Sequence, residues 1–551
     1  MGSIDLPWLP FEGPWQGNSV SDVGRRTYEW QRVCRISRRE IAAMNGRWRW
    51  GLSLNQPASP KGFKVNLLPK RCDHTVEKIG GTSISNTAAV VENVLIGGRE
   101  GSALYNRIFV VSAYSGMTDR LLEHKKNGKP GAYARFAGAR SRSAVVEAIA
   151  EVHREMRRIN SEVFGHSSER RVADRFVRDR IEGVRDCLLD LHRLCSYGHF
   201  RLEENLNTVR EILAALGEAH SSHNTALLLR TLGVEATFVD MTGWCDESEM
   251  SLDARIGAAL SAIDLGKQLP IVTGYSRCPG GLVQLYGRGY TEFTFARIAV
   301  LTGAKEAIVH KEYHLSTADP KIVGIERVRT IGHTNYDVAD QLSNLEVEAI
   351  HSAAAKELLH ANIPLRFKNT FEPRDEGTVI TRDYVSDKPQ AEIITGIRGV
   401  YALEFFEQDM VSVNGYDAEI LDKLKGYDVR IVTKASNANT ITHYLAAPPD
   451  VIARVVQALE EGFPTAAIVA TKVSIVSAIG SDLNLEGLTA TAVQALADAC
   501  IEILGVHQLM RHVDIIFIVD ESRFDDAVRA LHRALIEDSR PLAAQRGVLN
   551  G

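Results

Sequence analysis

Apolar segments of strand length alternate with longer amphipathic stretches from residue 74 onward. This alternation predicts an α/β fold, with a mostly parallel sheet covered by helices. Between residues 119 and 230 the pattern is almost wholly helical, and about residues 119–216 are predicted to form a helical excursion from the sheet. The expected strands are TVEKI (75–79), RIFVVSA (107–113), VEATFVD (234–240), LPIVTGY (269–275) and KEAIVHK (305–311).

The last part of the chain contains an internal repeat with a shift of 72 residues, which pairs Leu403 with Ile475 and Leu459 with Leu531. Strand, helix, strand, strand, helix is the expected order in both copies. The repeat therefore predicts two small ferredoxin-like βαββαβ units. The expected domains are 74–383, 392–466 and 467–540, with the charged, proline-containing linker YVSDKPQAE (384–392) after the first.

Residues 1–73 differ from the rest of the chain. They hold five of its six tryptophans and show no sustained strand or helix period. We interpret them either as a disordered extension or as the result of a start site placed too far upstream. Their acids, among them Asp5 and Glu12, argue against an organelle transit signal.

Length and composition narrow the function classes. A chain of 551 residues is too long for one core, so several domains are expected. A formal charge of -5 favours neither nucleic acid nor an anionic membrane, and no apolar run is long enough to span a bilayer. The seven cysteines form no CxxC pair, so neither a disulfide framework nor a zinc site is predicted. We expect a cytoplasmic protein that acts on small molecules.

The stretch VEKIGGTSIS (76–85) ends a predicted strand in two glycines. Exposed backbone N–H groups at such a strand end suit a phosphate, and Lys78 would add a positive charge. Neither the Walker pattern nor the Rossmann glycine pattern occurs in the chain. A plain strand-to-helix turn with a surface lysine is the alternative interpretation.

A second glycine cluster, YGRGYTE (286–292), precedes another predicted helix. The planar guanidinium of Arg288 between two glycines suits bidentate capture of a carboxylate. In ALGEAHSS (215–222), Glu218 follows Gly217 at the expected head of a helix and could receive an ammonium group. The alternatives are an arginine facing water and a carboxylate that complements the helix dipole.

Six motifs occur along the chain in this order: KIGGTS, VVSAYSGMTD, LGEAHSS, GRGYTE, STADPKIVG and IPLRFKNTFEPRDEGTVI. Their order and approximate spacing resemble those in aspartate kinases, which have the amino-acid kinase fold. The resemblance covers residues 74–538, and the doubled tail is similar to the paired ACT domains of that family. It implies transfer of the γ-phosphoryl group of MgATP to the side-chain carboxylate of L-aspartate, giving 4-phospho-L-aspartate and ADP.

The physical demands of this reaction agree with the residue types. A carboxylate with a pKa of about 3.9 is already ionised at neutral pH, so the nucleophile needs no general base. Cations and N–H donors must instead screen the meeting of two anions, which is the role expected for Lys78.

The resemblance also implies individual roles. Arg288 would bind the α-carboxylate of aspartate and Glu218 its ammonium group, with Gly289 and Thr291 beside them. A structural role is expected for Lys368 and Asn369. The residues expected around ATP are Gly80, Gly81, Thr82, Ser83, Ser112, Gly116, Asp319 and Lys321.

The segment HKEYHLSTADPK (310–321) departs from the family pattern TDVDGVYTADPR. Lys311 and Tyr313 replace two acids expected near the nucleotide, and Glu348 replaces a family lysine. One interpretation is a joint exchange of charges, with Lys311 as a second catalytic lysine. The alternative is a non-catalytic amino-acid-binding regulatory protein. A kinase for another small carboxylate or carbamate is disfavoured, because Glu218 and Arg288 together suit a zwitterion.

No protein-held metal is expected at His310 or His314, and Mg²⁺ should arrive with ATP. The segments HTVEKIGGTS, HKEYHLSTADP and TNYDVADQLSN resemble the aspartate kinases encoded beside ectoine biosynthesis enzymes. The segment HQLMRHVDIIFIVDESR lacks the polar strand with which related ACT pairs hold lysine or threonine, so inhibition by those amino acids is not expected. A homodimer or larger homo-oligomer formed through the ACT units is still expected.

Overall fold

The computed structural model describes residues 73–538, except 126–127, 140, 348–349, 412, 414 and 428. The expected N-terminal extension lies outside these residues except for its last position, and so does Glu348. Among the described residues, no helix is long and apolar enough to cross a membrane.

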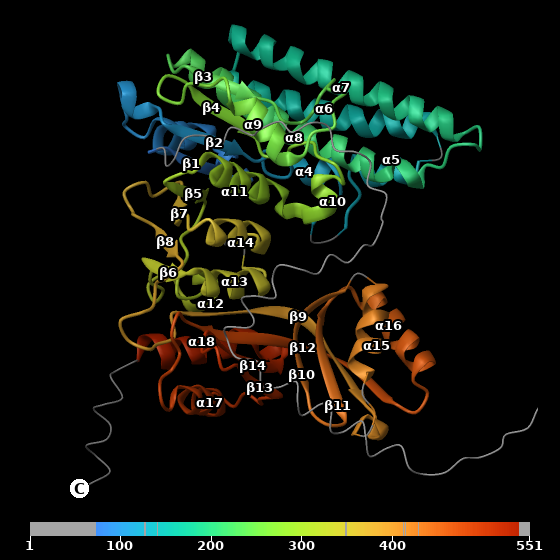
Figure 1. Cartoon of the computed structure of the whole chain (residues 1–551), viewed down its shortest axis with the longest axis vertical. Coiled ribbons are helices and arrows are strands. Elements are labelled where there is room, and N and C mark those ends of the chain that lie inside the picture. The colour runs from blue at the N-terminus through green and yellow to red at the C-terminus, as the bar shows by residue number, and fades with distance from the viewer. Residues whose placement is uncertain are drawn as a thin grey trace, which may run out of the picture. The chain divides into compact units, whose positions relative to one another are not determined.

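The first sheet has eight strands (Figure 1). All neighbouring strands are parallel except β7 and β8. The five predicted strands are present, and three further strands, β7, β8 and β6, extend the sheet at one end. In sheet order the strands are β3 (Ala236–Val239), β4 (Leu269–Thr273), β2 (Arg107–Val111), β1 (Thr75–Ile79), β5 (Glu306–Lys311), β7 (Leu365–Asn369), β8 (Thr378–Thr381) and β6 (His333–Asn335).

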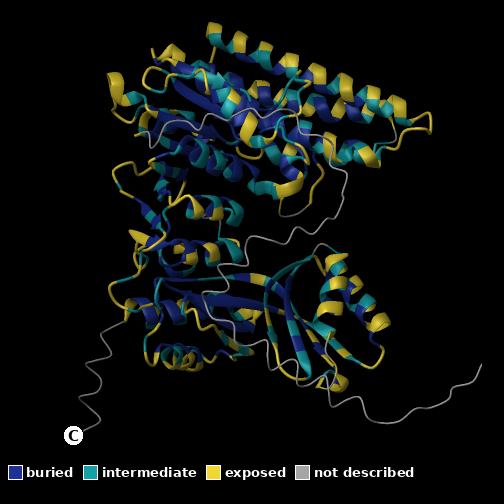
Figure 2. Cartoon of the chain, in the orientation of Figure 1, coloured by how far each residue is buried: buried dark blue, intermediate teal, exposed yellow. Residues whose placement is uncertain are grey.

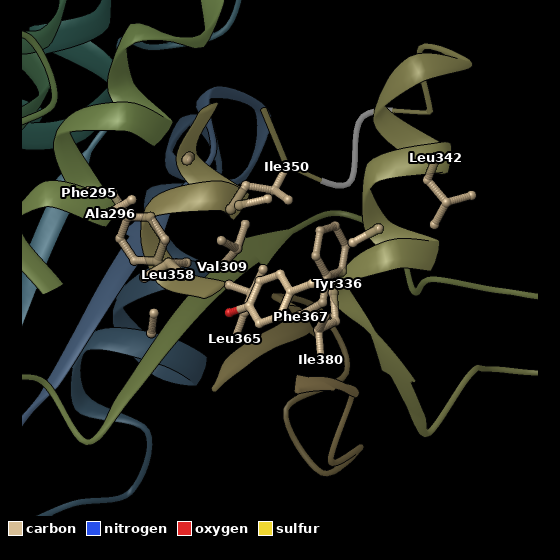
Figure 3. Packing of buried hydrophobic residues seen from close by; sticks show 14 of the residues in the cluster. Phe295, Ala296, Val309, Tyr336, Leu342, Ile350, Leu358, Leu365, Phe367 and Ile380 are labelled. Atoms are coloured by element: carbon tan, nitrogen blue, oxygen red, sulfur yellow. The ribbon is translucent and has the colours of Figure 1, made fainter. Parts of the chain in front are cut away.

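Both faces of this sheet are covered, which explains why its central strands read as continuous apolar runs. Alternate residues of β2 enter different cores: Ile108 and Val110 pack on one face, and Phe109 and Val111 on the other. Figure 2 shows the resulting buried layer, and Figure 3 shows the first core, where Phe295, Val309 and neighbouring side chains meet.

The helices of this part include three long ones that form the predicted helical excursion. These are α6 (Arg142–Phe164), α7 (Ser168–Cys195) and α8 (Leu206–Thr231). The others are α2 (Gly81–Ser85), α3 (Thr87–Val90), α4 (Met117–Leu121), α5 (Ala132–Ala137), α9 (Leu252–Leu260), α10 (Leu282–Tyr286), α11 (Tyr290–Thr302), α12 (Pro320–Val323), α13 (Tyr336–Asn344) and α14 (Ser352–His360), with a π-helix, η2 (Val91–Ile96), and three 3-10 turns, η3 (Gly101–Leu104), η4 (Glu203–Asn205) and η5 (Gly287–Gly289).

One prediction about these helices is wrong. Glu218 does not stand at the head of a helix but lies in the middle of α8, about three turns from its start. Gly217 is required there for packing rather than for a turn, because a Cβ atom at this position would lie 2.9 Å from the Cβ of Ala113.

The C-terminal sheet has six antiparallel strands and carries the predicted repeat. The order strand, helix, strand, strand, helix occurs twice, as expected. The first copy consists of β9 (Ile393–Phe406), α15 (Tyr416–Lys425), β10 (Arg430–Ser436), β11 (Thr440–Ala446) and α16 (Pro449–Gly462), and the second of β12 (Ala467–Ile479), α17 (Leu488–Asp498), β13 (Gly505–Gln508), β14 (Asp514–Asp520) and α18 (Phe524–His532), followed by a π-helix, η8 (Arg533–Glu537).

The two copies are not separate βαββαβ units. β9 and β12 are long strands that pair with each other along most of their length and run through both copies (Figure 1). Each copy therefore completes its four-stranded sheet with half of a strand that belongs to the other. A bulge near Gly399, whose φ is 68°, marks the point where one half ends and the next begins.

Candidate active site

Two lysines meet at the carboxyl edge of the first sheet. β1 and β5 are parallel neighbours, and their register pairs Lys78 with Val309. Side chains alternate along a strand, so Lys311 lies on the same face as Val309 and therefore as Lys78. Both lysines are buried at their strand ends, where α/β sheets commonly bind ligands.

Glu292 joins the two lysines. It lies in the first turn of α11, and its Oε1 atom is 3.1 Å from Nζ of Lys78 and 3.9 Å from Nζ of Lys311. The backbone N–H of His351 donates to its Oε2 atom at 2.6 Å. Burial alone would raise the pKa of Glu292, but the charges of Lys78 and Lys311 outweigh it and lower the pKa to about 2. The carboxylate is therefore ionised and holds both ammonium groups in place.

Glu218 provides a second, different carboxyl group. It is buried, and Thr291 donates its hydroxyl to Oε1, whereas Oε2 has no hydrogen-bond partner among the described residues. Burial raises the pKa of Glu218 to about 8, although Thr291 and Lys78 act in the opposite direction. An unsatisfied buried carboxyl oxygen is costly, so this atom is a natural partner for an ammonium group.

Arg288, which lies in the 3-10 turn η5, is held by partners other than Glu218. It forms an ion pair with Asp119 at 3.0 Å and donates to the backbone oxygen of Glu123. Gly289 beside it has no room for a side chain, because a Cβ atom would overlap the ring of His351. Capture of a substrate carboxylate would require Arg288 to share or release Asp119.

The first glycine pair forms a tight turn between β1 and α2. The N–H of Gly80 donates to the backbone oxygen of His310 at 3.0 Å. Gly81 approaches the neighbouring loop so closely that a Cβ atom would lie 2.7 Å from the oxygen of Ala113. Thr82 is exposed, whereas Ser83 is fully buried. The hydroxyl of Ser83 accepts a hydrogen bond from Thr370 at 3.0 Å.

The neighbouring loop brings two more predicted residues to this turn. Ser112 follows β2, and its N–H donates to the oxygen of Ile79 at 3.2 Å. Gly116 caps α4 with a φ of 73°, a conformation that favours glycine. Both glycine-containing loops therefore meet beside Lys78.

Asp319 and Lys321 lie at the start of α12 and are exposed. Asp319 caps α12 by accepting a hydrogen bond from the N–H of Lys321 at 2.8 Å. Their role near the nucleotide stays a prediction.

Within the described part of the chain, no group of three or more histidine, cysteine, aspartate or glutamate side chains could hold a metal ion. His310 is bonded to Glu77 at 2.8 Å on the opposite face of the sheet from Lys311. Lys368 and Asn369 lie in β7, beside β5.

Sequence reasoning missed Glu292. It was part of the GRGYTE motif but was not given a role. Its position in TEFTFARIAVLTGA (291–304) could have indicated a role. A single acid at the start of a largely apolar helix is expected to be buried, and a buried carboxylate needs a cation as its partner.

Comparisons with known proteins identify the family of this chain. The amino acid kinase family model matches residues 73–369, and an ACT domain model matches residues 469–533. The aspartate kinase Ask_Ect of Stutzerimonas stutzeri is 50% identical over 464 residues, which is 84% of this chain and 98% of the relative. The aspartokinase of Schizosaccharomyces pombe is 28% identical over 418 residues, 67% of this chain and 78% of the relative.

Solved structures show the same fold at lower identity. Aspartokinase III of E. coli in complex with lysine and aspartate (T-state) gives a TM-score of 0.64 at 16% identity and covers 84% of this chain and 100% of that one. The same enzyme with aspartate and ADP (R-state) gives 0.63 at 15% identity, covering 84% and 99%. Together with the sequence matches, these findings show that the chain is an enzyme of the amino acid kinase family and belongs to the aspartate kinases.

Proposed function

We propose that this enzyme transfers the γ-phosphoryl group of MgATP to the side-chain carboxylate of L-aspartate, giving 4-phospho-L-aspartate and ADP. The observation that carries the proposal is the convergence of Lys78 and Lys311 on Glu292 beside the Gly80–Gly81 turn. The site thus concentrates positive charge where two anionic reactants would have to meet.

The substrate side of the site follows from the free carboxyl oxygen of Glu218. The ammonium group of aspartate would bind this oxygen, and Arg288 would bind the α-carboxylate after sharing Asp119. The side-chain carboxylate would then point toward Lys78 as the nucleophile. It is ionised at neutral pH, so no protein group has to remove a proton.

The lysines would act mainly in the transition state. One opposite charge at about 4 Å is worth roughly 4 kcal/mol at an effective dielectric of about 20, which is on the order of a thousandfold in rate if it is felt only there. Backbone N–H groups of the Gly80–Ser83 turn would hold the phosphates, with Ser112 and Gly116 nearby. Mg²⁺ bound with ATP supplies further charge neutralisation, and Asp319 and Lys321 would lie near the nucleotide.

Lys311 is the residue that departs most from the family pattern. Its position on the same face as Lys78 supports a role for Lys311 as a second catalytic lysine. The family has an acid at position 311 and a lysine at position 348, so the two charges would have been exchanged together in this chain. In the double variant Lys311→Asp/Glu348→Lys, turnover should recover at least tenfold relative to Lys311→Asp alone. No recovery would argue against the exchange.

The finer biological setting is also a proposal. The resemblance of HKEYHLSTADP to aspartate kinases encoded with ectoine enzymes, and the name Ask_Ect of the S. stutzeri relative, support a place at the beginning of ectoine synthesis. We propose a cytoplasmic enzyme with a catalytic domain of about residues 74–383 and ACT-like units at 392–466 and 467–540, which assembles as a homodimer or larger homo-oligomer through these units.

The decisive experiment is aspartate-dependent release of ADP, with the acyl phosphate trapped by hydroxylamine as the aspartyl hydroxamate. Release of ADP that is indifferent to aspartate would contradict the proposal. The alternative, an amino-acid-binding regulatory protein, predicts that calorimetry detects aspartate but no nonhydrolysable ATP analogue at millimolar concentration.

A further inference from the structure

The segment STADPKIVG (316–324) packs against the C-terminal sheet. Ala318 and Val323 belong to the same buried core as Ile394 of β9 and Leu531 of α18. The guanidinium of Arg529 in α18 donates to the backbone oxygen of Ile322 at 2.9 Å. This segment, which carries Asp319 and Lys321, is therefore held by elements that lie more than 70 residues further along the chain.

Thr317 is the polar centre of this contact. It is buried, and every polar group it has is used. Its N–H donates to the oxygen of Arg329 at 2.9 Å, and its own oxygen accepts from the N–H of Ile394 at 2.8 Å. Its hydroxyl accepts from the N–H of Arg329 at 3.1 Å and lies 3.0 Å from Nε2 of His532.

For a neutral imidazole, the neighbours of His532 define the direction of this last bond. His532 is fully buried, and its Nδ1 atom is 2.9 Å from a carboxylate oxygen of Glu537, which accepts hydrogen bonds but does not donate when ionised. Nδ1 must therefore carry the hydrogen. In the neutral ring Nε2 is then an acceptor, so the hydroxyl of Thr317 donates to it. One ordered chain of hydrogen bonds runs from Arg329 through Thr317 and His532 to Glu537.

We propose that Thr317 and His532 are positioning residues for ATP: through this chain the second C-terminal copy sets the place of α12, and with it Asp319 and Lys321. The C-terminal sheet is then a structural part of the nucleotide site and not only an appended sensor. The inference rests on the proposed function in one respect, that ATP lies near Asp319 and Lys321.

A second buried threonine provides a matched control. The hydroxyl of Thr334 in β6 donates to Glu392 at 3.0 Å, and Glu392 also binds Ser481 of the C-terminal part. Thr334 is as buried as Thr317 and bridges to the same sheet, but its strand carries no predicted nucleotide residue. Loss of a buried hydrogen bond is therefore common to both sites, whereas an effect on ATP is expected only at Thr317.

The test compares Thr317→Val, Thr317→Ser and Thr334→Val in the full chain. Valine keeps the shape of threonine but removes the hydroxyl, and serine keeps the hydroxyl. Thr317→Val should raise the KM for ATP about five- to tenfold and weaken binding of a nonhydrolysable ATP analogue by a similar factor, with the KM for aspartate within about twofold. Thr317→Ser should stay within about twofold of the parent, and Thr334→Val should lower the unfolding temperature without changing ATP affinity.

His532 supplies an independent variant in case Thr317→Val folds poorly. His532→Leu should give the same selective loss of ATP affinity, and adding Thr317→Val to it should cause little further loss because both act through one bond. His532→Gln, whose side-chain oxygen can replace Nε2 as the acceptor, should recover part of the affinity.

The outcomes separate this inference from the proposed function. Equal effects of Thr317→Val and Thr334→Val on ATP affinity, or lower thermal stability with unchanged ATP affinity at Thr317 and His532, would overturn the positioning role. Failure of the parent protein to bind the ATP analogue would instead contradict the proposed function, and the inference would fall with it.

Discussion

The two faces of the β1–β5 pair each carry a buried ionic cluster, and the clusters differ in how completely they are satisfied. On one face, Glu77 binds Arg107 through two hydrogen bonds of 2.7 and 3.1 Å and His310 at 2.8 Å. Arg107 also donates to the backbone oxygens of Leu95 and Val94 at 2.8 and 2.7 Å. Burial would raise the pKa of Glu77, but Arg107 and His310 outweigh it and hold the pKa well below its usual range.

On the other face, Lys78 and Lys311 lie near the single carboxylate of Glu292, and Glu218 keeps one buried oxygen without a partner among the described residues. Burial of charge is common to both clusters, so it does not identify a site. The difference lies in the unmatched oxygen and in the position at the carboxyl edge of the strands. We conclude that the first cluster holds the sheet together and that the second is arranged to receive ligands.

Removal of Lys78 should have the largest effect on activity. In Lys78→Met, turnover should fall on the order of a thousandfold, because the charge nearest the transferred group is lost. The unfolding midpoint in urea should change little, since Lys311 still faces Glu292. Hydroxamate formation at the parental rate would contradict the assignment of this face.

The corresponding change on the opposite face is Arg107→Met, which should act on stability. It leaves the carboxylate of Glu77 buried without the guanidinium that neutralises it, so the free energy of unfolding should fall by about 3 kcal/mol or more. Urea denaturation measures this loss. Activity per folded molecule should stay near the parental value, and adding Glu77→Gln should restore part of the stability. A loss of activity in the fully folded variant would show that this face also contributes to activity, against the proposed difference between the two faces.

Removal of Lys311 should have a smaller catalytic effect than removal of Lys78, because its Nζ atom lies farther from Glu292. Lys311→Ala should lower kcat by roughly ten- to a hundredfold with a smaller change in KM for aspartate. Steady-state assays of ADP release test this. An unchanged kcat would show that one lysine suffices.

Arg288 should affect the substrate more than the chemistry. Arg288→Ala should raise the KM for aspartate about tenfold, since a contact present in both ground and transition states is lost. Asp119→Asn is the control, because it releases Arg288 from its ion pair and should leave the KM for aspartate equal or lower. A rise of KM in Asp119→Asn as large as in Arg288→Ala would indicate that the pair is structural.

The smallest expected effect is the pH dependence set by Glu218. Its pKa of about 8 means that the empty site holds a proton at pH 7, and an ammonium group must displace it. Affinity for aspartate should therefore rise with pH, by about fivefold from pH 7 to pH 8. Calorimetry in buffers of different ionisation enthalpy should detect the released proton, and Glu218→Gln should abolish the dependence.

The same shift makes a contribution to stability with a defined sign. The folded chain binds a proton at Glu218 that the unfolded chain releases near pH 4.5, so this contribution decreases as pH rises from there through about 8. Relative to the parent, Glu218→Gln should be more stable toward the upper end of that range. Stability that rises with pH only in the parent would contradict the raised pKa.

The strands that build the site were predictable from sequence, because TVEKI and KEAIVHK are segments of strand length that contain β-branched residues. β6 and β8 were not predicted, since three or four residues give no usable period. Gly217 was interpreted as the start of a helix, although it is the small residue that lets α8 approach Ala113. Glu292 gained its meaning only from the sheet, which brings two lysines that are 233 positions apart to one carboxylate.

The repeat shows the same limit of sequence-based prediction for a longer segment. A shift of 72 residues predicted the element order, because hydrophobic positions recur with it. It could not show that β9 and β12 each serve both copies, because strand pairing between distant segments leaves no local period.

That sharing has a consequence for how the tail can be altered. A strand of 14 residues extends about 46 Å, so one continuous strand, β9, passes through both copies and is interrupted only by the bulge near Gly399. Deletion of either copy would remove one of the four strands from the sheet of the other copy and expose a long row of unpaired backbone N–H and C=O groups. We therefore expect that the two copies can be deleted or moved to another protein only together.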